Sequence, residues 1–289
     1  MFEKVIVPYL EKYFESLDNK KVKDIIKYSV SGGKCIRGFI VKHIIEKLGT
    51  GDESNTVQWE PIVAVELIHA ASLIVDDLPC MDNDKIRRNK PSTFVKYGKH
   101  EAILFSFFII SESIRLLNKS IQSPQLLNNM ITEWCELLGK NLVIGQLMDI
   151  NSEATDFFNI KKTNFSDDII SYKTCSLFSF AFILGGMFSR KDINIAEFKK
   201  MGYHFGMIFQ LVDDYKDKEE DEISSNYILK NGKKKSLLKY KNERCHLIQL
   251  LEKNQLLTPE FVTIIATLDA AFIPDGQVKN VMTTCPYAQ

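Results

Sequence analysis

Apolar residues recur along this chain of 289 residues at intervals of three and four positions. The spacing is clear in Ile40–Leu48, Leu137–Ile144 and Ile169–Leu177, and it is typical of helices that bury one face. Neither an alternation of period two nor an Asn-Gly hairpin signal stands out. The pattern therefore predicts an all-α protein.

Glycines and prolines divide the chain into segments of helical length. These breaks lie at Gly32-Gly33, Gly49–Gly51, Pro91, Pro124, Gly185-Gly186 and Gly232. None of them is a long flexible linker, and no internal repeat is evident. Residues 1–289 are therefore expected to form a single domain.

The composition excludes several classes of protein. Hydrophobic residues make up 45% of the chain, which is ample for a core, and Lys+Arg equals Asp+Glu at 37 each. The balanced charge and the lack of a basic stripe argue against a nucleic-acid partner. The longest apolar run, Ala102–Ile110, is about half as long as the roughly 20 residues of a membrane crossing, so no membrane span is expected.

Two further features bear on location. The first residues include an acid, Glu3, and lack an apolar core of secretory length, which argues against a signal peptide. The six cysteines occur singly, without a Cys-x-x-Cys pair, as expected of free thiols in a reducing compartment. A cytoplasmic location is the expectation.

Two aspartate clusters carry the candidate chemistry. Asp76–Asp82 reads Asp-Asp-Leu-Pro-Cys-Met-Asp and Asp213–Asp217 reads Asp-Asp-Tyr-Lys-Asp, each after a strongly apolar stretch. Adjacent carboxylates repel, and their burial is costly unless a cation or hydrogen-bond donors compensate. Mg2+ takes oxygen ligands, usually one or two carboxylates plus substrate phosphates. The pair of clusters predicts a Mg2+-diphosphate site shared between two helices, whereas either cluster alone could be an acidic helix end.

The spacing around the first cluster is that of one helix face. His69, Ser72 and Asp76 fall on the same side of a helix, and Pro79 then disturbs the helix so that Asp82 can turn back toward Asp76. A lone histidine is more often a hydrogen-bonded core residue than a ligand. Its place two turns before Asp76 nevertheless makes His69 a candidate for a second phosphate.

The second cluster has similar spacing. Gln210, Asp213 and Asp217 fall at i, i+3 and i+7, so a helix presents all three on one face. The segment Gly145–Asp149 could supply hydrogen bonds to groups around a metal rather than bind it directly.

Cations and hydroxyls that suit phosphate oxygens occur at three further places. An arginine pair follows the first cluster, a lysine and an arginine follow two glycines where a helix is expected to start, and a Lys-Thr pair lies between two helical stretches. The residues are Arg87, Arg88, Lys34, Arg37, Lys173 and Thr174.

Taken together, these motifs resemble the trans-polyprenyl diphosphate synthases, and specifically the geranylgeranyl diphosphate synthases of bacteria and plastids. The family's motifs are present in order as Asp76–Asp82, Arg87-Arg88, Gly145–Asp149, Lys173-Thr174 and Phe209–Asp217. The resemblance implies an all-α barrel of antiparallel helices around a deep apolar cavity, active as a homodimer. It also implies a Mg2+-dependent head-to-tail condensation of isopentenyl diphosphate with an allylic diphosphate, which would be dimethylallyl, geranyl or farnesyl diphosphate.

The resemblance further implies a role for each candidate residue. About three Mg2+ ions would be bound once diphosphate is present. Their ligands would be Asp76, Asp82 and Asp213, supported by Asp77, Asp214 and Asp217. The allylic diphosphate would be held by Arg87, Lys173, Thr174 and Gln210. Isopentenyl diphosphate would be held by Lys34, Arg37, His69 and Arg88. Catalysis would then depend on Asp76, Asp82, Asp213, Lys173 and Arg87.

Product length is expected to depend on residues beside the first cluster. Ser72 lies one helical turn before Asp76, with Ala71 next to it, and the resemblance implies that a bulky aromatic here stops chain growth. Two small residues favour geranylgeranyl diphosphate as the main product, unless Phe105, Phe107 or Phe108 forms a floor to the cavity. Farnesyl diphosphate is the second expectation.

The chain also departs from the family pattern. Cys35 stands where arginine is usual, Asn89 where glycine follows the arginine pair, and Phe94 where histidine is common. The Gly-Lys-x-x-Gly-Lys-Asp stretch expected after Asp217 is not recognisable, and Lys218, Lys230 and Lys233 are the candidates to replace its lysine. Two alternative functions therefore stay open: a non-catalytic partner subunit of a synthase, and a class I terpene cyclase.

Overall fold

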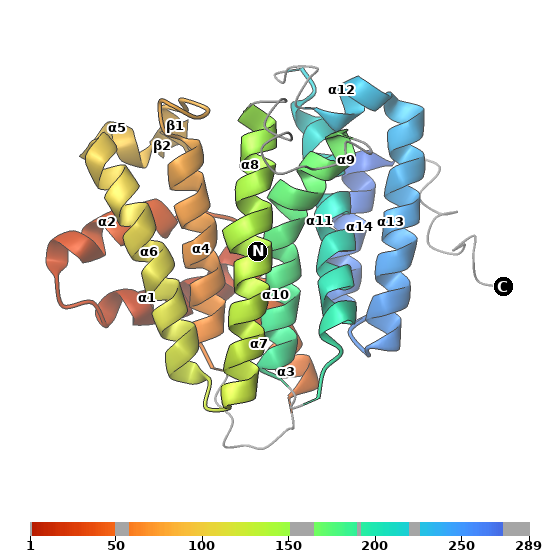
Figure 1. Ribbon diagram of the computed structural model, residues 1–289. Coiled ribbons are helices and arrows are strands. Elements are labelled where there is room, and N and C mark those ends of the chain that lie inside the picture. The colour runs from red at the N-terminus through yellow and green to blue at the C-terminus, as the bar shows by residue number, and fades with distance from the viewer. Residues whose placement is uncertain (1, 50–57, 151–164, 190–191, 220–225, 274–289) are drawn as a thin grey trace. The chain divides into compact units, whose positions relative to one another are not determined.

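Long helices carry most of the chain in the computed structural model, which describes residues 2–49, 58–150, 165–189, 192–219 and 226–273 (Figure 1). The all-α prediction is confirmed. One small departure within these residues is an antiparallel hairpin of β1 (Ile86–Arg87) and β2 (Lys90–Pro91), in which Ile86 lies opposite Pro91. Strands of two residues are too short to leave a periodic signal in the sequence.

The chain folds as two compact units. The first comprises Met1–Thr132 with Leu184–Asp192, and the second comprises Glu133–Ile183 with Ile193–Gln289. The single domain over residues 1–289 stays a prediction.

The first unit is built around one apolar helix, α4 (Glu60–Asp76), whose residues from Pro61 to Ile68 are all buried. Helix α4 packs against α6 (Lys99–Ser120), and the two lie side by side in Figure 1. The buried face of α6 includes the small residues Ala102, Ser106 and Ser113, which allow close packing. The other helices of this unit are α1 (Phe2–Glu15), α2 (Lys20–Val30), α3 (Ile36–Leu48), α5 (Thr93–Tyr97) and most of α7 (Pro124–Trp134).

The second unit is built around α11 (Ile195–Asp217), which packs against α13 (Lys233–Lys253) and α14 (Pro259–Phe272). Its core contains Phe178, Phe182, Phe205 and Phe261, whose rings contact one another in pairs 5.0–5.9 Å apart. The remaining elements are π-helical Cys135–Asn141, α8 (Leu142–Ile150), α9 (Phe165–Ile170), π-helical Ser171–Cys175, α12 (Tyr227–Asn231) and most of α10 (Ser176–Met187), whose residues from Leu184 belong to the first unit.

One helical stretch, Asp167–Met187, is long and apolar enough to cross a membrane by length and composition. Its most apolar window, of mean hydropathy 1.4, is however 72% buried within the protein. Phe178, Phe180 and Phe182 are completely covered. The stretch is therefore a core helix, and no clear membrane span is present among the described residues.

The cysteines follow the sequence-based expectation only in part. Cys35, Cys80, Cys135 and Cys175 are free thiols. Cys245 is disulfide-bonded, so the expectation of free thiols is wrong for this residue.

Candidate active site

The first aspartate cluster forms a tight turn directly after α4. The helix ends at Asp76, and the amide of Asp82 donates a hydrogen bond to the carbonyl of Asp76 at 2.9 Å. The amide of Met81 likewise bonds the carbonyl of Leu78 at 2.9 Å. The chain thus returns Asp82 to Asp76 across the turn that contains Pro79, as the position of the proline predicts.

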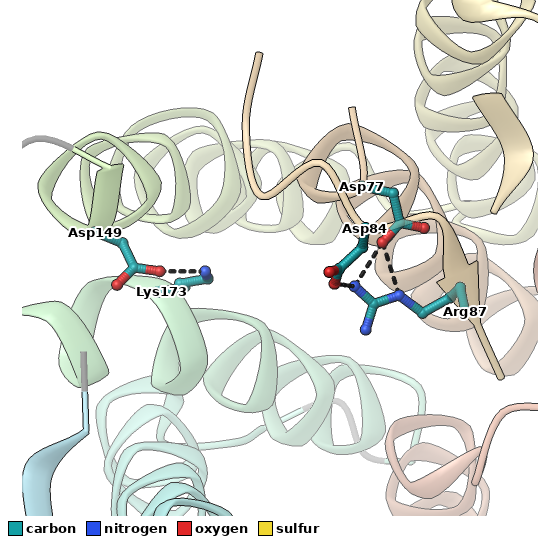
Figure 2. A network of polar contacts seen from close by, with 5 residues as sticks. All are labelled: Asp77, Asp84, Arg87, Asp149 and Lys173. Carbon is teal, nitrogen blue, oxygen red and sulfur yellow. Dashed lines mark hydrogen bonds and ion pairs between the residues drawn. The ribbon is translucent and has the colours of Figure 1, made fainter. Parts of the chain in front are cut away.

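Asp77 faces the protein and holds Arg87 (Figure 2). Its carboxylate, in a residue only 2% exposed, accepts bonds from Nε and Nη2 of Arg87 at 2.8 and 2.5 Å, and Nη2 also reaches Asp84 at 2.8 Å. Burial raises the pKa of Asp77, and the hydrogen bond and charge of Arg87 oppose that shift. Asp76 is half-buried and Asp82 is exposed, so the pair Asp76-Asp77 divides into an outer and an inner carboxylate.

Arg88 caps the C-terminal end of α2. Its Nη1 donates to the carbonyls of Ser29 and Val30 at 3.1 and 2.6 Å, which satisfies acceptors that a helix end leaves open. A Cβ on Gly33 would lie 2.7 Å from Nη2 of Arg88, so a larger residue there would displace the guanidinium from its present position. The glycine pair singled out in the sequence therefore makes room for a guanidinium.

Asn89 replaces the glycine of the family pattern without loss of the turn. Arg88 and Asn89 form the two-residue hairpin turn with φ of 54° and 60°. Both positions need left-handed backbone, which asparagine tolerates better than most residues. This departure is compatible with the hairpin that carries Arg87.

Lys34 lies in the loop before α3 and is not part of a helix. Helix α3 begins at Ile36, and Cys35 precedes it with φ of 53°. The expectation that a helix starts at both cations is therefore wrong for Lys34, which is exposed and lies in the preceding loop, whereas Arg37 belongs to α3. Burial, and then the charge of Glu66, raise the pKa of the Cys35 thiol to about 12, so it stays protonated at neutral pH.

Glu66 is a buried carboxylate beside these cations that the sequence analysis missed. Its Oε1 accepts the amide of Gly38 at 2.7 Å, and the residue is 3% exposed. Burial raises its pKa, whereas the Gly38 hydrogen bond and the charges of Arg37 and Arg88 oppose that shift. A single acid inside the apolar run of α4, three residues before His69, was the available signal.

His69 interacts electrostatically with the cations predicted to share its ligand. Burial lowers its pKa well below 6.5, and the charges of Arg37, Arg88 and Arg87 lower it further. His69 is therefore neutral at physiological pH. Arg37, His69 and Arg88, three of the four residues proposed for isopentenyl diphosphate, lie within one electrostatic cluster of the first unit.

The second aspartate cluster repeats the division seen in the first. Thr174 Oγ1 donates to Gln210 Oε1 at 2.7 Å, and Gln210 Nε2 donates to Asp214 Oδ1 at 2.7 Å. Asp214, 5% exposed, also accepts the amide of Tyr227 at 2.8 Å. Asp214 is thus the inner carboxylate, while Asp213 is half-buried and Asp217 is exposed.

Lys173 pairs with Asp149, whose carboxylate lies 2.5 Å from Nζ (Figure 2). Lys173 and Thr174 belong to π-helical Ser171–Cys175 rather than to a break between helices. A Cβ on Gly145 would lie 2.3 Å from the amide nitrogen of Lys173. Gly145 therefore permits the close approach of α8 that brings Asp149, about one turn later, to Lys173.

Two lysines flank Tyr215 within the second cluster. Nζ of Lys233 lies 3.2 Å from the hydroxyl of Tyr215, and Nζ of Lys218 lies 4.5 Å from the ring centre. The Lys233 hydrogen bond, followed by the charge of Lys218, lowers the pKa of Tyr215. Lys218 and Lys233 thus lie beside Tyr215 of the cluster. The replacement of the missing family lysine by Lys218, Lys230 or Lys233 stays a prediction.

The residues expected to set product length lie on α4 and α6. Ala71 is 1% exposed, and the hydroxyl of Ser72 donates to the carbonyl of His69 at 3.0 Å. Phe105 is half-buried and contacts Phe108, with ring centres 6.0 Å apart. Phe107 and Phe108 are 63% and 39% exposed. Their role as a cavity floor stays a prediction.

The described residues combine an all-α fold with two divided aspartate clusters, each accompanied by a cation. The family model for polyprenyl synthetases matches residues 19–246, which include both clusters. The chain belongs to the polyprenyl synthetase family.

Individual relatives agree with that membership. The chain is 31% identical over 209 residues to geranylgeranyl pyrophosphate synthase 12 of Arabidopsis thaliana, with 70% of this chain and 57% of the relative covered. It spans little more than half the length of the curated relatives it matches.

Solved structures share the fold over nearly the whole chain. A geranyltranstransferase from Thermotoga maritima is 26% identical, with a TM-score of 0.74 and coverage of 93% of this chain and 97% of that one. A geranyltransferase from Helicobacter pylori, described as complexed with magnesium and isoprenyl diphosphate, is 22% identical with a TM-score of 0.70 and covers 92% and 95% of the two chains.

Proposed function

We propose that this protein is a prenyltransferase that condenses isopentenyl diphosphate with an allylic diphosphate and forms mainly geranylgeranyl diphosphate. One observation supports this most strongly. Each Asp-Asp pair fixes its second carboxylate inside the protein, while the first is only half-buried and a further aspartate is exposed. Together with family membership, this arrangement favours a pair of metal-diphosphate half-sites.

The donor set fits Mg2+. Asp76, Asp82 and Asp213 offer carboxylate oxygens, the ligands that this hard cation prefers, with Asp77, Asp214 and Asp217 in support. When bound, about three Mg2+ ions would stabilise the negative charge that develops on the departing diphosphate. We propose that each cluster, together with its Mg2+, binds diphosphate oxygens.

The protein's own cations would orient that allylic diphosphate. Arg87 is held by Asp77 but keeps a side chain 32% exposed, and Lys173 is held by Asp149 with 25% exposed. Both cations are thereby ordered before a ligand arrives, which lowers the entropy cost of binding. Thr174 and Gln210, already hydrogen-bonded to each other, would complete this group.

The second substrate, isopentenyl diphosphate, would be held by Lys34, Arg37, His69 and Arg88. Arg37 and Arg88 supply positive charge. His69 is neutral, and its single N–H can donate a hydrogen bond without prior protonation of the ring. The exposed Lys34 adds a mobile cation from the loop before α3. Closure of the site over both substrates would exclude water from the reacting carbons.

One assay tests the activity. Purified full-length protein is incubated with Mg2+, radiolabelled isopentenyl diphosphate and dimethylallyl, geranyl or farnesyl diphosphate in turn, and the products are separated by chain length. We expect geranylgeranyl diphosphate, and none from Asp213→Ala. A product that stops at farnesyl diphosphate would indicate a farnesyl diphosphate synthase. A cyclic hydrocarbon would indicate a terpene cyclase, and no turnover would favour a non-catalytic partner subunit.

A homodimer is part of the proposal. One stretch of α6 exposes large apolar side chains, at Ile103, Leu104, Phe107 and Phe108. Exposed apolar patches of this kind mark association surfaces. Sedimentation of wild type and Phe107→Glu would test this, with dissociation expected for the variant. A cytoplasmic location is proposed as well, to be tested by cell fractionation.

A further inference from the structure

A further group of metal-ligating side chains lies in the second unit, apart from the aspartate cluster of α11. It consists of His204 on α11 and Glu243 and His246 on α13, whose potential ligand atoms all lie within 4.8 Å of one another. Nδ1 of His204 is 2.5 Å from Oε2 of Glu243, and the two imidazole centres are 5.2 Å apart.

Helix geometry explains how these residues meet. Glu243 and His246 are three positions apart, so they share one face of α13. Helix α11 packs against α13 (Figure 1). His204 of α11 thereby comes close to Glu243 and His246. His204 precedes Asp213 by nine residues, or about 13 Å along the helix. The cluster is therefore separate from the proposed Mg2+ ligands of α11.

The carboxylate of Glu243 is held in an orientation that suits a single-oxygen ligand. Its Oε1 lies 3.1 Å from Nζ of Lys239, which is itself 3.6 Å from Asp167, while Oε2 is directed at His204. Burial raises the pKa of Glu243, but the hydrogen bonds and charges of His204 and Lys239 outweigh it and lower the pKa overall. Glu243 is thus an ionised carboxylate whose Oε1 is held by Lys239, in the way that neighbouring residues orient carboxylate ligands in many metal sites.

We propose that His204, Glu243 and His246 bind a divalent transition metal ion of the Zn2+ type. Two imidazole nitrogens and one carboxylate oxygen are a common zinc ligand set, with water at the fourth position. Mg2+ prefers oxygen ligands alone, so the two kinds of site differ in the metal they select. Ligand atoms around tetrahedral zinc lie about 3.3 Å apart, which requires His204 and Glu243 to separate slightly and His246 to move inward.

The exposure of the three residues is consistent with this rearrangement. Glu243 is buried, His204 is half-buried and His246 is exposed, so the ion can enter from solvent and the last ligand is the one able to move. A bound ion would cross-link α11 to α13. Because it binds the folded state, it would stabilise the protein in proportion to its affinity and concentration.

Zinc binding by the full chain tests the proposal. The exposed thiols of Cys80 and Cys135 are first alkylated, and excess Mg2+ is present to occupy the oxygen sites. Bound zinc is then measured by competition with a chromophoric chelator. We expect wild type to bind one more Zn2+ than His246→Ala. His100→Ala, which removes an exposed histidine of α6, should bind as wild type does.

Thermal unfolding gives an independent measurement. Added Zn2+ should raise the Tm of wild type and His100→Ala but leave that of His246→Ala unchanged. Glu243→Gln keeps the size of the side chain, and we expect it to lower zinc affinity at least about tenfold. Equal zinc content in wild type and in His246→Ala would overturn the proposal. So would an undiminished affinity in Glu243→Gln, and neither outcome depends on prenyl transfer.

Discussion

At the residue scale, the two aspartate pairs share one arrangement. The second aspartate of each pair, Asp77 or Asp214, is buried and accepts hydrogen bonds from the protein, whereas Asp76 and Asp213 are half-buried. Adjacent residues on a helix point about 100° apart, so Asp213 and Asp214 of α11 can differ in burial, and Asp77 follows Asp76 at the C-terminal cap of α4. The sequence shows the pair, but only the structure shows which member is which.

This division predicts that substitutions of the adjacent residues Asp213 and Asp214 affect different properties of the protein. Asp213→Ala should lower kcat at least about a hundredfold, or about 2.7 kcal/mol in the barrier, while the helical fold stays intact. Asp214→Ala should lower the free energy of unfolding by about 1–3 kcal/mol, because Gln210 and the Tyr227 amide lose their acceptor. Steady-state kinetics and urea unfolding of both variants provide the measurement. Less than a tenfold loss of kcat in Asp213→Ala would remove this residue from the mechanism.

His69 gives a prediction on pH dependence. Its pKa in the folded protein lies well below 6.5, chiefly through burial and then through Arg37, Arg88 and Arg87. The unfolded chain binds this proton near pH 6.5, so the contribution of neutral His69 to stability is full above that pH and is lost as pH falls below it. We expect the free energy of unfolding to decrease more between pH 7 and pH 5 in wild type than in His69→Gln. Parallel curves for the two proteins would show that His69 is not the group responsible.

At the element scale, the sequence predicted the major helices well. The apolar runs that become α4 and α11 are long, and each ends in an aspartate cluster. The helical periodicity of these segments and the ends of the two helices could therefore be predicted from the sequence. The sequence did not predict the hairpin Ile86–Pro91 or π-helical Ser171–Cys175. Two-residue strands carry no alternation, and five residues of π-helix do not shift a hydrophobic period enough to be detected.

Gly145 allows α8 to pack closely against the segment that carries Lys173. The motif suggested hydrogen bonds around a metal, yet a Cβ there would lie 2.3 Å from the backbone of Lys173. Gly145→Ala should therefore force α8 away from the lysine-bearing segment and cost about 1–3 kcal/mol of stability. It should also raise the KM for the allylic diphosphate, because Lys173 moves.

A matched control for Gly145→Ala lies in the preceding π-helical segment. A Cβ on Gly139 would meet only the Trp134 ring at 3.6 Å, an ordinary contact. Gly139→Ala should be neutral or slightly stabilising, since alanine is the better helix former. Chemical unfolding of both variants distinguishes packing from propensity. Equal effects would refute the close-approach argument.

At the scale of the whole molecule, the ordered set of motifs carried most of the information. Family membership, the all-α fold and the cations near each cluster could be predicted because they depend on short segments of sequence. Glu66 and the partners of Arg88 could not, because they depend on which helices pack together. The same reasoning applies to the His204-Glu243-His246 cluster, whose members come from two helices that only the fold makes neighbours.

The length of the product is expected to depend on side chains from more than one helix, namely α4 and α6. Ala71 and Ser72 precede Asp76 on α4, and both are small at the place where we propose that an aromatic side chain would obstruct a growing chain. Ala71 is 1% exposed, so Ala71→Tyr must also displace core atoms, at a cost of about 1–3 kcal/mol. Ser72 is half-buried, and Ser72→Tyr can place its ring without that displacement.

We therefore expect Ser72→Tyr to shift the main product from geranylgeranyl to farnesyl diphosphate while the helical content and the Tm stay close to wild type. Ala71→Tyr should shift the product in the same direction with a lower Tm. Chromatography of radiolabelled products, together with thermal unfolding, measures both effects. If neither tyrosine changes the product distribution, chain growth is limited elsewhere, and Phe105→Ala and Phe108→Ala on α6 are the next variants to compare. A longer product from either of these two would then place the limit at the phenylalanines, because removal of a ring lengthens the space available to the growing chain.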